Sequence, residues 1–272
     1  GAAEDPWRDQ QPYGPSDTWP GVDAAAHHLA DQLRAIRVRE PGRAVDLVGH
    51  SMGGIVALYY LTHLHDPYDV TLPPIGNIVT IASPHRGSDL AEAGVWLRAA
   101  TATRQAIDTL LRLVPSSGGG RQVERTPLDM PALDQLATGS TLLDGHARAW
   151  QDAVAAGGAG ALATGTRVLT IGGASDLVAT PHRTAHPTTG DGRLVTDAPH
   201  VVLPGGHESV RHSEAIREVV WDFLHGRDVD HASTVFTASL VDDAGLALRV
   251  VGRAAAFGSG PVTDLSSVRV DR

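Results

Sequence analysis

The segment 47–54, Leu-Val-Gly-His-Ser-Met-Gly-Gly, constrains the fold more than any other part of this chain. Residues 44–48 have the branched apolar composition of a short buried strand, and residues 55–61 are apolar nearly all round, as in a buried helix. A strand that passes into a helix within about five residues must bend sharply between them, and Ser51 occupies that bend. We therefore predict a nucleophile elbow of the G-x-S-x-G type, with the Ser51 hydroxyl at the carboxyl edge of a sheet.

The glycines of this pattern have a steric role. Gly49 and Gly53 lack a Cβ atom, so the strand and the helix can approach closely and Ser51 can adopt unusual backbone angles. The bend also points the first N–H groups of the helix, with its positive end, toward whatever binds there.

The rest of the chain alternates between strand and helix patterns. Apolar runs predict three further strands, and amphipathic stretches predict helices before the elbow and after the last strand, with Ser213 as the N-cap of the latter. Such alternation predicts an α/β fold with a mostly parallel sheet covered by helices on both faces. The expected strands are 77–82, 167–171 and 200–203, and the expected helices are 23–37 and 213–224.

Two segments fall outside this alternation. Residues 89–165 carry no strand signal and predict a helical lid or cap insertion, with one or two amphipathic helices within 89–114 and a further helical stretch within 132–156. The main domain is expected to span 1–227. Residues 228–272 are expected to form a small β-hairpin-rich extension, with strands at 234–241 and 247–251.

Three reactive side chains each follow a predicted strand closely. Ser51 comes three residues after its strand, Asp176 five and His207 four. Ligands of parallel sheets bind beyond the carboxyl ends of the strands. A serine hydroxyl needs a base within hydrogen-bond reach, and the base needs an acid that fixes its tautomer. The order Ser, Asp, His at strand ends therefore predicts a catalytic triad.

Other residues compete for two of these roles. Asp191 and Asp197 are alternative acids, but neither directly follows a predicted strand. His200 and His212 are alternative bases, although the first lies at the start of a strand and the second at a helix entry. Asp176 could also be an ordinary turn residue.

Two further histidines have a spacing that could suggest a metal pair. His182 and His186 are four residues apart, but they lie in a proline-rich loop with no helical frame. We therefore expect them to be solvated side chains, and we predict neither a metal nor a cofactor.

Composition excludes several classes of function. The formal net charge is −9 and lysine is absent, so no basic stripe is available to bind nucleic acid. The absence of cysteine excludes disulfides, thiol catalysis and thiolate metal sites. The chain has no run of 18 apolar residues, so we predict no transmembrane span. The sequence leaves localisation and oligomeric state open.

Three segments of this chain resemble the α/β-hydrolase superfamily, and within it the bacterial lipases and esterases. Residues 45–54 are very close to the nucleophile elbow of that family, and residues 81–88 resemble the strand end that precedes the lid of lipases. Residues 131–137 with 140–143 are similar to a lid-region segment. The resemblance covers roughly residues 15–226. It implies Ser51 as nucleophile, Asp176 as acid, His207 as base and the Met52 N–H as an oxyanion donor.

The chain departs from this family pattern at its beginning. The family places a strand ending in His-Gly, then a helix and another strand, before the first helix predicted here. The His-Gly turn supplies the second oxyanion N–H, and residues 1–22 contain no such segment. We therefore expect a fragment whose strand at 44–48, central in the family sheet, has an exposed apolar outer edge.

The sequence as a whole predicts a serine ester hydrolase acting on a small-molecule or lipid ester, with possible contact to a lipid interface. An acyltransferase with the same triad is one alternative. A hydrolase-like domain without activity is another, because of the missing amino-terminal segment. The length of the acyl chain is left open by the sequence.

Overall fold

The computed structural model describes residues 20–99, 131–157, 165–187, 199–229 and 244. The predicted hairpin at 234–251 and much of the expected lid therefore lie outside the described residues. None of the helices in these ranges combines the length and the apolar character that crossing a bilayer requires.

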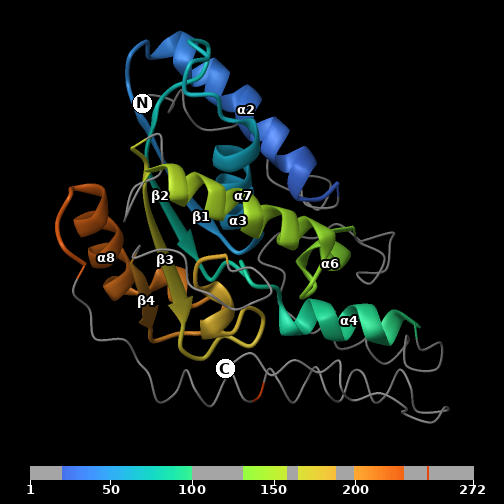
Figure 1. Ribbon diagram of the computed structural model, residues 1–272. Helices are drawn as coiled ribbons and strands as arrows, with labels where there is room; N and C mark the ends of the chain where they lie inside the picture. Colours follow the sequence, from blue (N-terminus) through green and yellow to red (C-terminus); the bar gives the residue numbers. More distant parts are fainter. Residues whose placement is uncertain (1–19, 100–130, 158–164, 188–198, 230–243, 245–272) are drawn as a thin grey trace, which may run out of the picture.

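A parallel four-stranded sheet forms the centre of the molecule (Figure 1). Its order is β1-β2-β3-β4, and every neighbouring pair is parallel. The carboxyl ends of all four strands therefore meet at one edge, and the predicted mostly parallel α/β sheet is confirmed. The strands are β1 (Val45–His50), β2 (Ile75–Ile81), β3 (Arg167–Gly173) and β4 (His200–Leu203).

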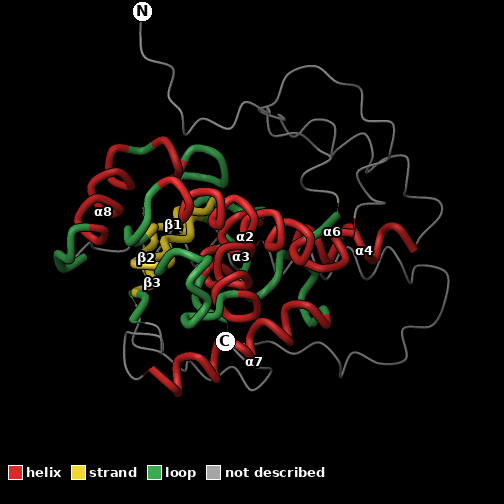
Figure 2. Tube along the Cα trace, turned by 90° about the horizontal axis from the view of Figure 1, so that it is seen from above, coloured by secondary structure: helices red, strands yellow, loops and turns green. Residues whose placement is uncertain are grey.

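Helices cover both faces of this sheet because neighbouring side chains of each strand point to opposite sides. Ile78 of β2 packs in one core with α2, α3 and α7, whereas Val79 packs in a second core with α8. Figures 1 and 2 show α8 across the sheet from the other helices. The helices are α2 (Val22–Arg39), α3 (Met52–Tyr59) with its π-helical end (Tyr60–Leu64), α7 (Thr141–Gly157) and α8 (Glu214–Leu224).

The start of α8 is set by the predicted N-cap. The Ser213 side chain accepts a hydrogen bond from the Ile216 N–H at 3.2 Å. Such a bond satisfies one of the N–H groups that the first helical turn leaves without a partner.

The segment after β2 differs from the sequence prediction in its second half. It begins with α4 (Asp89–Ala99), as expected. The single helical stretch predicted within 132–156 is instead two helices, α6 (Pro131–Leu136) and α7. Gly139, with a φ of 73°, lies in the turn between them, and the Ser140 hydroxyl accepts the Leu143 N–H at the start of α7.

Strand β1 is less buried than its apolar sequence predicts. Within the described residues it pairs on one side only, with β2, so it is an edge strand and not a central one. Its residues alternate between half-buried and exposed, and Val48 is 52% exposed. The predicted burial of this strand is therefore wrong, because an apolar run does not record what packs against the faces of a strand, whereas the described residues agree with the expected unpaired outer edge.

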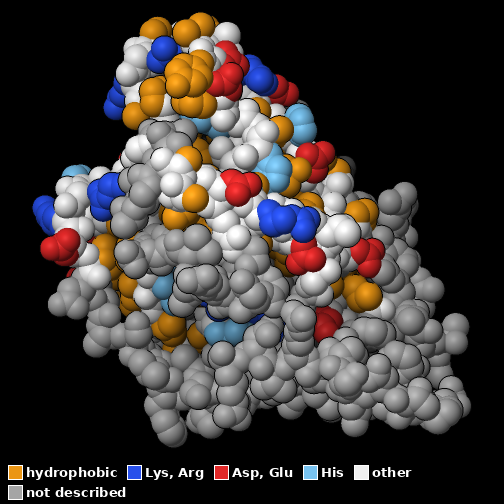
Figure 3. All heavy atoms as spheres, in the orientation of Figure 1, with side chains coloured by type: hydrophobic (Ala, Val, Ile, Leu, Met, Phe, Trp, Pro, Cys, Tyr) orange, Lys and Arg blue, Asp and Glu red, His pale blue; other side chains and the backbone are white. Residues whose placement is uncertain are grey.

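Exposed apolar side chains also gather at the end of α2 (Figure 3). Val38, Tyr68 and Val70 are 80%, 90% and 80% exposed. They precede β1 and β2 in the chain and so lie at the amino ends of these strands, opposite the edge that carries Ser51.

Candidate active site

The predicted elbow lies between β1 and α3, and its serine has a strained backbone. Ser51 has φ 55° and ψ −130°, a positive φ that residues with a side chain rarely adopt. Its N–H donates to the Ile81 carbonyl of the neighbouring strand at 2.8 Å, and its own carbonyl accepts the Gly54 N–H at 3.1 Å. These bonds hold the bend and place the hydroxyl beyond the carboxyl end of β1.

Close packing at the elbow depends on two glycines, one of which was not predicted. A Cβ on Gly49 would lie 2.6 Å from the backbone of Gly53, as the predicted contact between strand and helix requires. A Cβ on Gly54 would overlap the Ser83 hydroxyl. A Cβ on Gly53 would meet no atom within 4 Å, so the predicted steric role of this glycine belongs to Gly54.

This difference gives a stability test. Gly49→Ala should lower the free energy of unfolding by about 3 kcal/mol, because the clash is with backbone that no side-chain rotation can relieve. Gly53→Ala is the matched control in the same motif, and it should raise that free energy by about 0.5–1 kcal/mol by favouring the helix. Urea unfolding of both variants measures the two effects, and equal effects would contradict this account of the elbow.

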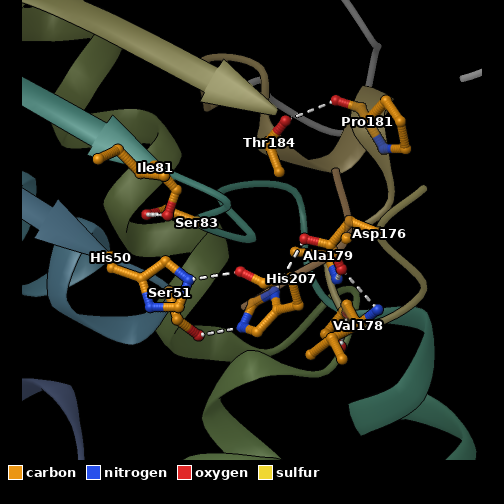
Figure 4. A network of polar contacts seen from close by, with 12 residues as sticks. His50, Ser51, Ile81, Ser83, Asp176, Val178, Ala179, Pro181, Thr184 and His207 are labelled. Atoms are coloured by element: carbon orange, nitrogen blue, oxygen red, sulfur yellow. Dashed lines mark hydrogen bonds and ion pairs between the residues drawn. The ribbon is translucent and has the colours of Figure 1, made fainter. Parts of the chain in front are cut away.

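The three predicted triad residues form one chain of hydrogen bonds (Figure 4). His207 Nε2 lies 2.9 Å from Ser51 Oγ, and His207 Nδ1 lies 2.8 Å from Asp176 Oδ2. In the tautomer that satisfies both contacts, Nδ1–H donates to the carboxylate and Nε2 accepts from the serine hydroxyl. The Asp176 side chain is 0% exposed and that of His207 is 15% exposed, so the imidazole lies between buried acid and accessible serine.

The Asp176 side chain is fixed by its own loop. Asp176 Oδ1 accepts the N–H groups of Val178 at 2.8 Å and Ala179 at 2.9 Å. This turn uses one carboxylate oxygen and leaves Oδ2 for His207 (Figure 4). Asp176 is therefore both a turn residue, which was the alternative considered for it, and the partner of the His207 imidazole.

The alternative bases lie in other elements of the fold. His200 is the first residue of β4, and its Nδ1 forms a 2.8 Å hydrogen bond with Thr170 Oγ1. His212 ends a short 3₁₀ helix, Val210–His212. Of the alternative acids, Asp191 and Asp197 lie outside the described residues.

His50 is a neighbour of the triad that sequence reasoning did not identify. Its Nε2–H donates to the His207 carbonyl at 2.8 Å, and the two rings lie 4.9 Å apart. Burial lowers the pKa of His50, which favours the neutral ring. Its position directly before Ser51 was the available signal, since the end of β1 must face the loop that carries His207.

One group in the described residues has the composition of a metal site. His50, His207 and Glu208 each offer a ligand atom, and these atoms lie within 4.8 Å of one another. Both ring nitrogens of His207 are already in contact with Asp176 and Ser51, and Glu208 forms an ion pair with Arg211 at 2.5 Å. We therefore assign no metal to this group.

The prediction of solvated loop histidines is wrong for His186. Its ring is buried and stacks on the Trp150 indole of α7, with ring centroids 5.4 Å apart. Arg86 Nε donates to the His186 carbonyl at 3.1 Å and holds the loop against the protein. The prolines around His186 indicated a loop correctly, but a local pattern does not show what a loop packs against.

Two more histidines are buried, one in α7 and one in the segment after β2. His146 and His85 have ring centroids 6.2 Å apart, and His85 Nε2 lies 2.9 Å from Thr80 Oγ1. Burial, with a smaller effect of His63, lowers the pKa of His146 to about 3. Burial, followed by the effect of His146, holds the pKa of His85 well below 6.5. Both rings are therefore neutral in the folded protein near pH 7.

These two rings should make stability depend on pH. Below pH 6.5 the unfolded chain binds protons that the folded protein excludes, so the free energy of unfolding should fall by about 1.4 kcal/mol per pH unit for each histidine. His146→Phe should remove one histidine's share of the slope. Urea unfolding between pH 7 and 5 measures the slope. A slope that is the same with and without His146 would show that this ring does not resist protonation.

The sheet, the elbow at its carboxyl edge and the side chains that converge there define an α/β-hydrolase fold, and the chain is a member of the α/β-hydrolase superfamily. Within it, residues 22–116 match the family described as the PGAP1-like alpha/beta domain. The resemblance inferred from the sequence is thereby confirmed. Among curated proteins the sequence has no significant match.

Several solved structures are similar in fold at low sequence identity. The mature lipase BlEst2 of Bacillus licheniformis is 18% identical, with a TM-score of 0.47, over 75% of this chain and 74% of its own. The lin2722 product of Listeria innocua is 17% identical, with a TM-score of 0.45, over 78% of this chain and 70% of its own. Phospholipase PlaB of Legionella pneumophila, in complex with thio-NAD, is 20% identical, with a TM-score of 0.37, over 56% of this chain and 26% of its own. The chain thus spans about a quarter of the length of this phospholipase.

Proposed function

We propose that the protein is a serine ester hydrolase of the lipase or carboxylesterase type. The observation that carries this proposal is the continuous chain of hydrogen bonds from Ser51 through His207 to Asp176, built on a strained elbow. Strain of this kind persists where the surrounding structure enforces it, and it is common at active sites. The positive φ of Ser51 supports a role for its hydroxyl in chemistry.

The proposed reaction passes through an acyl-enzyme. Ser51 Oγ attacks the ester carbonyl while His207 Nε2 takes the hydroxyl proton. His207 then gives this proton to the departing alcohol, which leaves the acyl group on Ser51. In the second half His207 takes a proton from water, the resulting hydroxide releases the carboxylic acid, and Ser51 regains its proton. Asp176 stabilises the imidazolium that forms in both halves.

The developing oxyanion needs hydrogen-bond donors. Met52 directly follows Ser51 and is the first residue of α3, so its N–H belongs to the positive end of a helix. We propose this N–H as one oxyanion donor.

The surroundings of the acid favour a neutral, partly apolar substrate. Leu177 follows Asp176 directly and is 54% exposed, and the neighbouring Val178 belongs to the same turn. An exposed leucine next to a buried carboxylate provides apolar surface at the edge of the site. We propose esters with an acyl chain as the substrate class.

A fluorophosphonate probe tests the function directly. The serine oxygen attacks the phosphorus of the probe and displaces fluoride only where a base activates the hydroxyl, so we expect stoichiometric phosphonylation that peptide mass spectrometry maps to Ser51. Hydrolysis of p-nitrophenyl esters of increasing chain length should accompany it. Heat-denatured protein is the control and should not react. A folded protein that neither reacts with the probe nor hydrolyses esters would support the alternative of an inactive domain.

A further inference from the structure

The loop that carries the proposed acid is attached to the segment that follows β2. We call residues 176–186 the acid loop. Ser88 Oγ donates to the Val178 carbonyl of this loop at 2.5 Å, and the Val178 N–H donates to Asp176 Oδ1 at 2.8 Å. Two hydrogen bonds through one residue thus connect Ser88 to the acid.

A buried ion pair makes the second connection. Asp89, the first residue of α4, accepts from Thr180 Oγ1 at 3.1 Å through Oδ2 and contacts Arg183 Nη2 at 3.3 Å through Oδ1. The side chains of Asp89 and Arg183 are 0% and 5% exposed. Both Thr180 and Arg183 belong to the acid loop, so the Asp89 carboxylate binds the loop at two places.

The backbone completes the connection. The Arg86 N–H donates to the Arg183 carbonyl at 3.1 Å, and Arg183 Nη1 donates to the Arg86 carbonyl at 3.0 Å. Arg183 therefore contacts Arg86, before α4, through its main chain and Nη1, and it contacts Asp89, at the start of α4, through Nη2.

Burying two charges is a poor way to gain stability, because the cost of removing them from water offsets their attraction. A buried pair does restrict the geometry of the segments that it joins. In the present fold the restricted segments are the acid loop and the start of α4.

From this geometry we propose that Asp89, together with Arg183, is a positioning residue for Asp176. Asp89 holds the acid loop so that Oδ1 of Asp176 stays in the turn and Oδ2 faces His207. The placement of α4 and the orientation of the acid are thereby coupled. The proposal rests on the proposed function, in which Asp176 orients His207.

A double-mutant cycle tests this coupling. Asp176→Asn alone should lower kcat by up to about 10⁴-fold through the wrong tautomer of the base. Asp89→Asn alone should lower kcat by about 10- to 100-fold, with KM within about twofold, because it misplaces the acid without touching the substrate. In the Asp176→Asn background, Asp89→Asn should change kcat by less than about twofold. A loss that multiplies in the double variant would overturn the proposal.

A spectroscopic measurement separates this proposal from the proposed function. The Nδ1 proton of His207 in its bond to Asp176 should give a low-field proton NMR signal, absent in Asp176→Asn. We expect Asp89→Asn to shift or remove this signal. A signal unchanged in Asp89→Asn overturns the positioning role even if the protein hydrolyses esters, and a signal that shifts supports it even if no ester is hydrolysed.

Two variants control for folding. Thr166→Val removes another buried hydroxyl bond, from Thr166 Oγ1 to the Ile75 carbonyl at 2.7 Å, at the amino ends of the strands. It should lower the melting temperature without changing kcat or the NMR signal. Thr180→Val removes one hydrogen bond to Asp89 and keeps the charges of Asp89 and Arg183. It replaces Asp89→Asn in the double-mutant cycle if that variant does not fold. Thr180→Val should lower kcat less than Asp89→Asn does, and this loss should disappear in the Asp176→Asn background. A loss in kcat that persists in that background would overturn the proposal.

Discussion

Replacing Ser51 by alanine should abolish ester hydrolysis and labelling by the fluorophosphonate probe. Loss of an activated nucleophile lowers the rate by about 10⁶-fold in well-built triads. Alanine at φ 55° is as strained as serine, and the bonds that hold the bend are made by the backbone of residue 51. The variant should therefore keep its fold while losing its chemistry.

Steady-state kinetics with a short-chain ester, together with circular dichroism and thermal unfolding, distinguish these two effects. Ser51→Gly provides a matched variant, because glycine accepts the positive φ without strain. It should be equally inactive and melt at a higher temperature than Ser51→Ala. Retention of most activity in either variant would show that another group is the nucleophile.

Replacing His207 by alanine should cause a loss similar to that of Ser51→Ala, about 10⁶-fold in kcat, because the two residues act as one unit. Its Nε2 lies 2.9 Å from Ser51 Oγ, within the reach that proton transfer requires. The double variant should lose little more than either single variant. Kinetics of the three proteins on one ester measure this non-additivity.

The competing histidines provide the matched controls. His200→Ala breaks the contact with Thr170 at the start of β4, and His212→Ala alters the end of a 3₁₀ helix. Both variants should retain most of the activity. Equal sensitivity at His212 would transfer the role of base to that residue and contradict our assignment of the loop after β4.

The sequence predicted best what depends on neighbours in the chain. Strand β4 spans the predicted residues 200–203, and α8 begins after the predicted cap Ser213. The strand-to-helix bend at Ser51 is also a local property, since it follows from two adjacent apolar segments and the glycines between them. The rule that ligands bind at strand ends then indicated which distant side chains could meet.

What the sequence missed depends on contacts between segments far apart in the chain. Asp89 and Arg183 are separated by 94 residues, and neither has a local pattern that marks it as a partner of the other. His186 was expected to face solvent because only its own loop was considered. The low burial of β1 depends on what packs against its faces, which an apolar run does not encode.

The spacing of the triad along the chain has a consequence for biosynthesis. Ser51 and His207 are 156 residues apart, and the strands between them must pair before the imidazole reaches the hydroxyl. Because a ribosome makes the chain from its amino end, the elbow is synthesised long before its base has left the exit tunnel. Until the residues past β4 have been made, Ser51 lacks its partner in the proposed triad, so the proposed hydrolytic activity can arise only after β4 has joined the sheet.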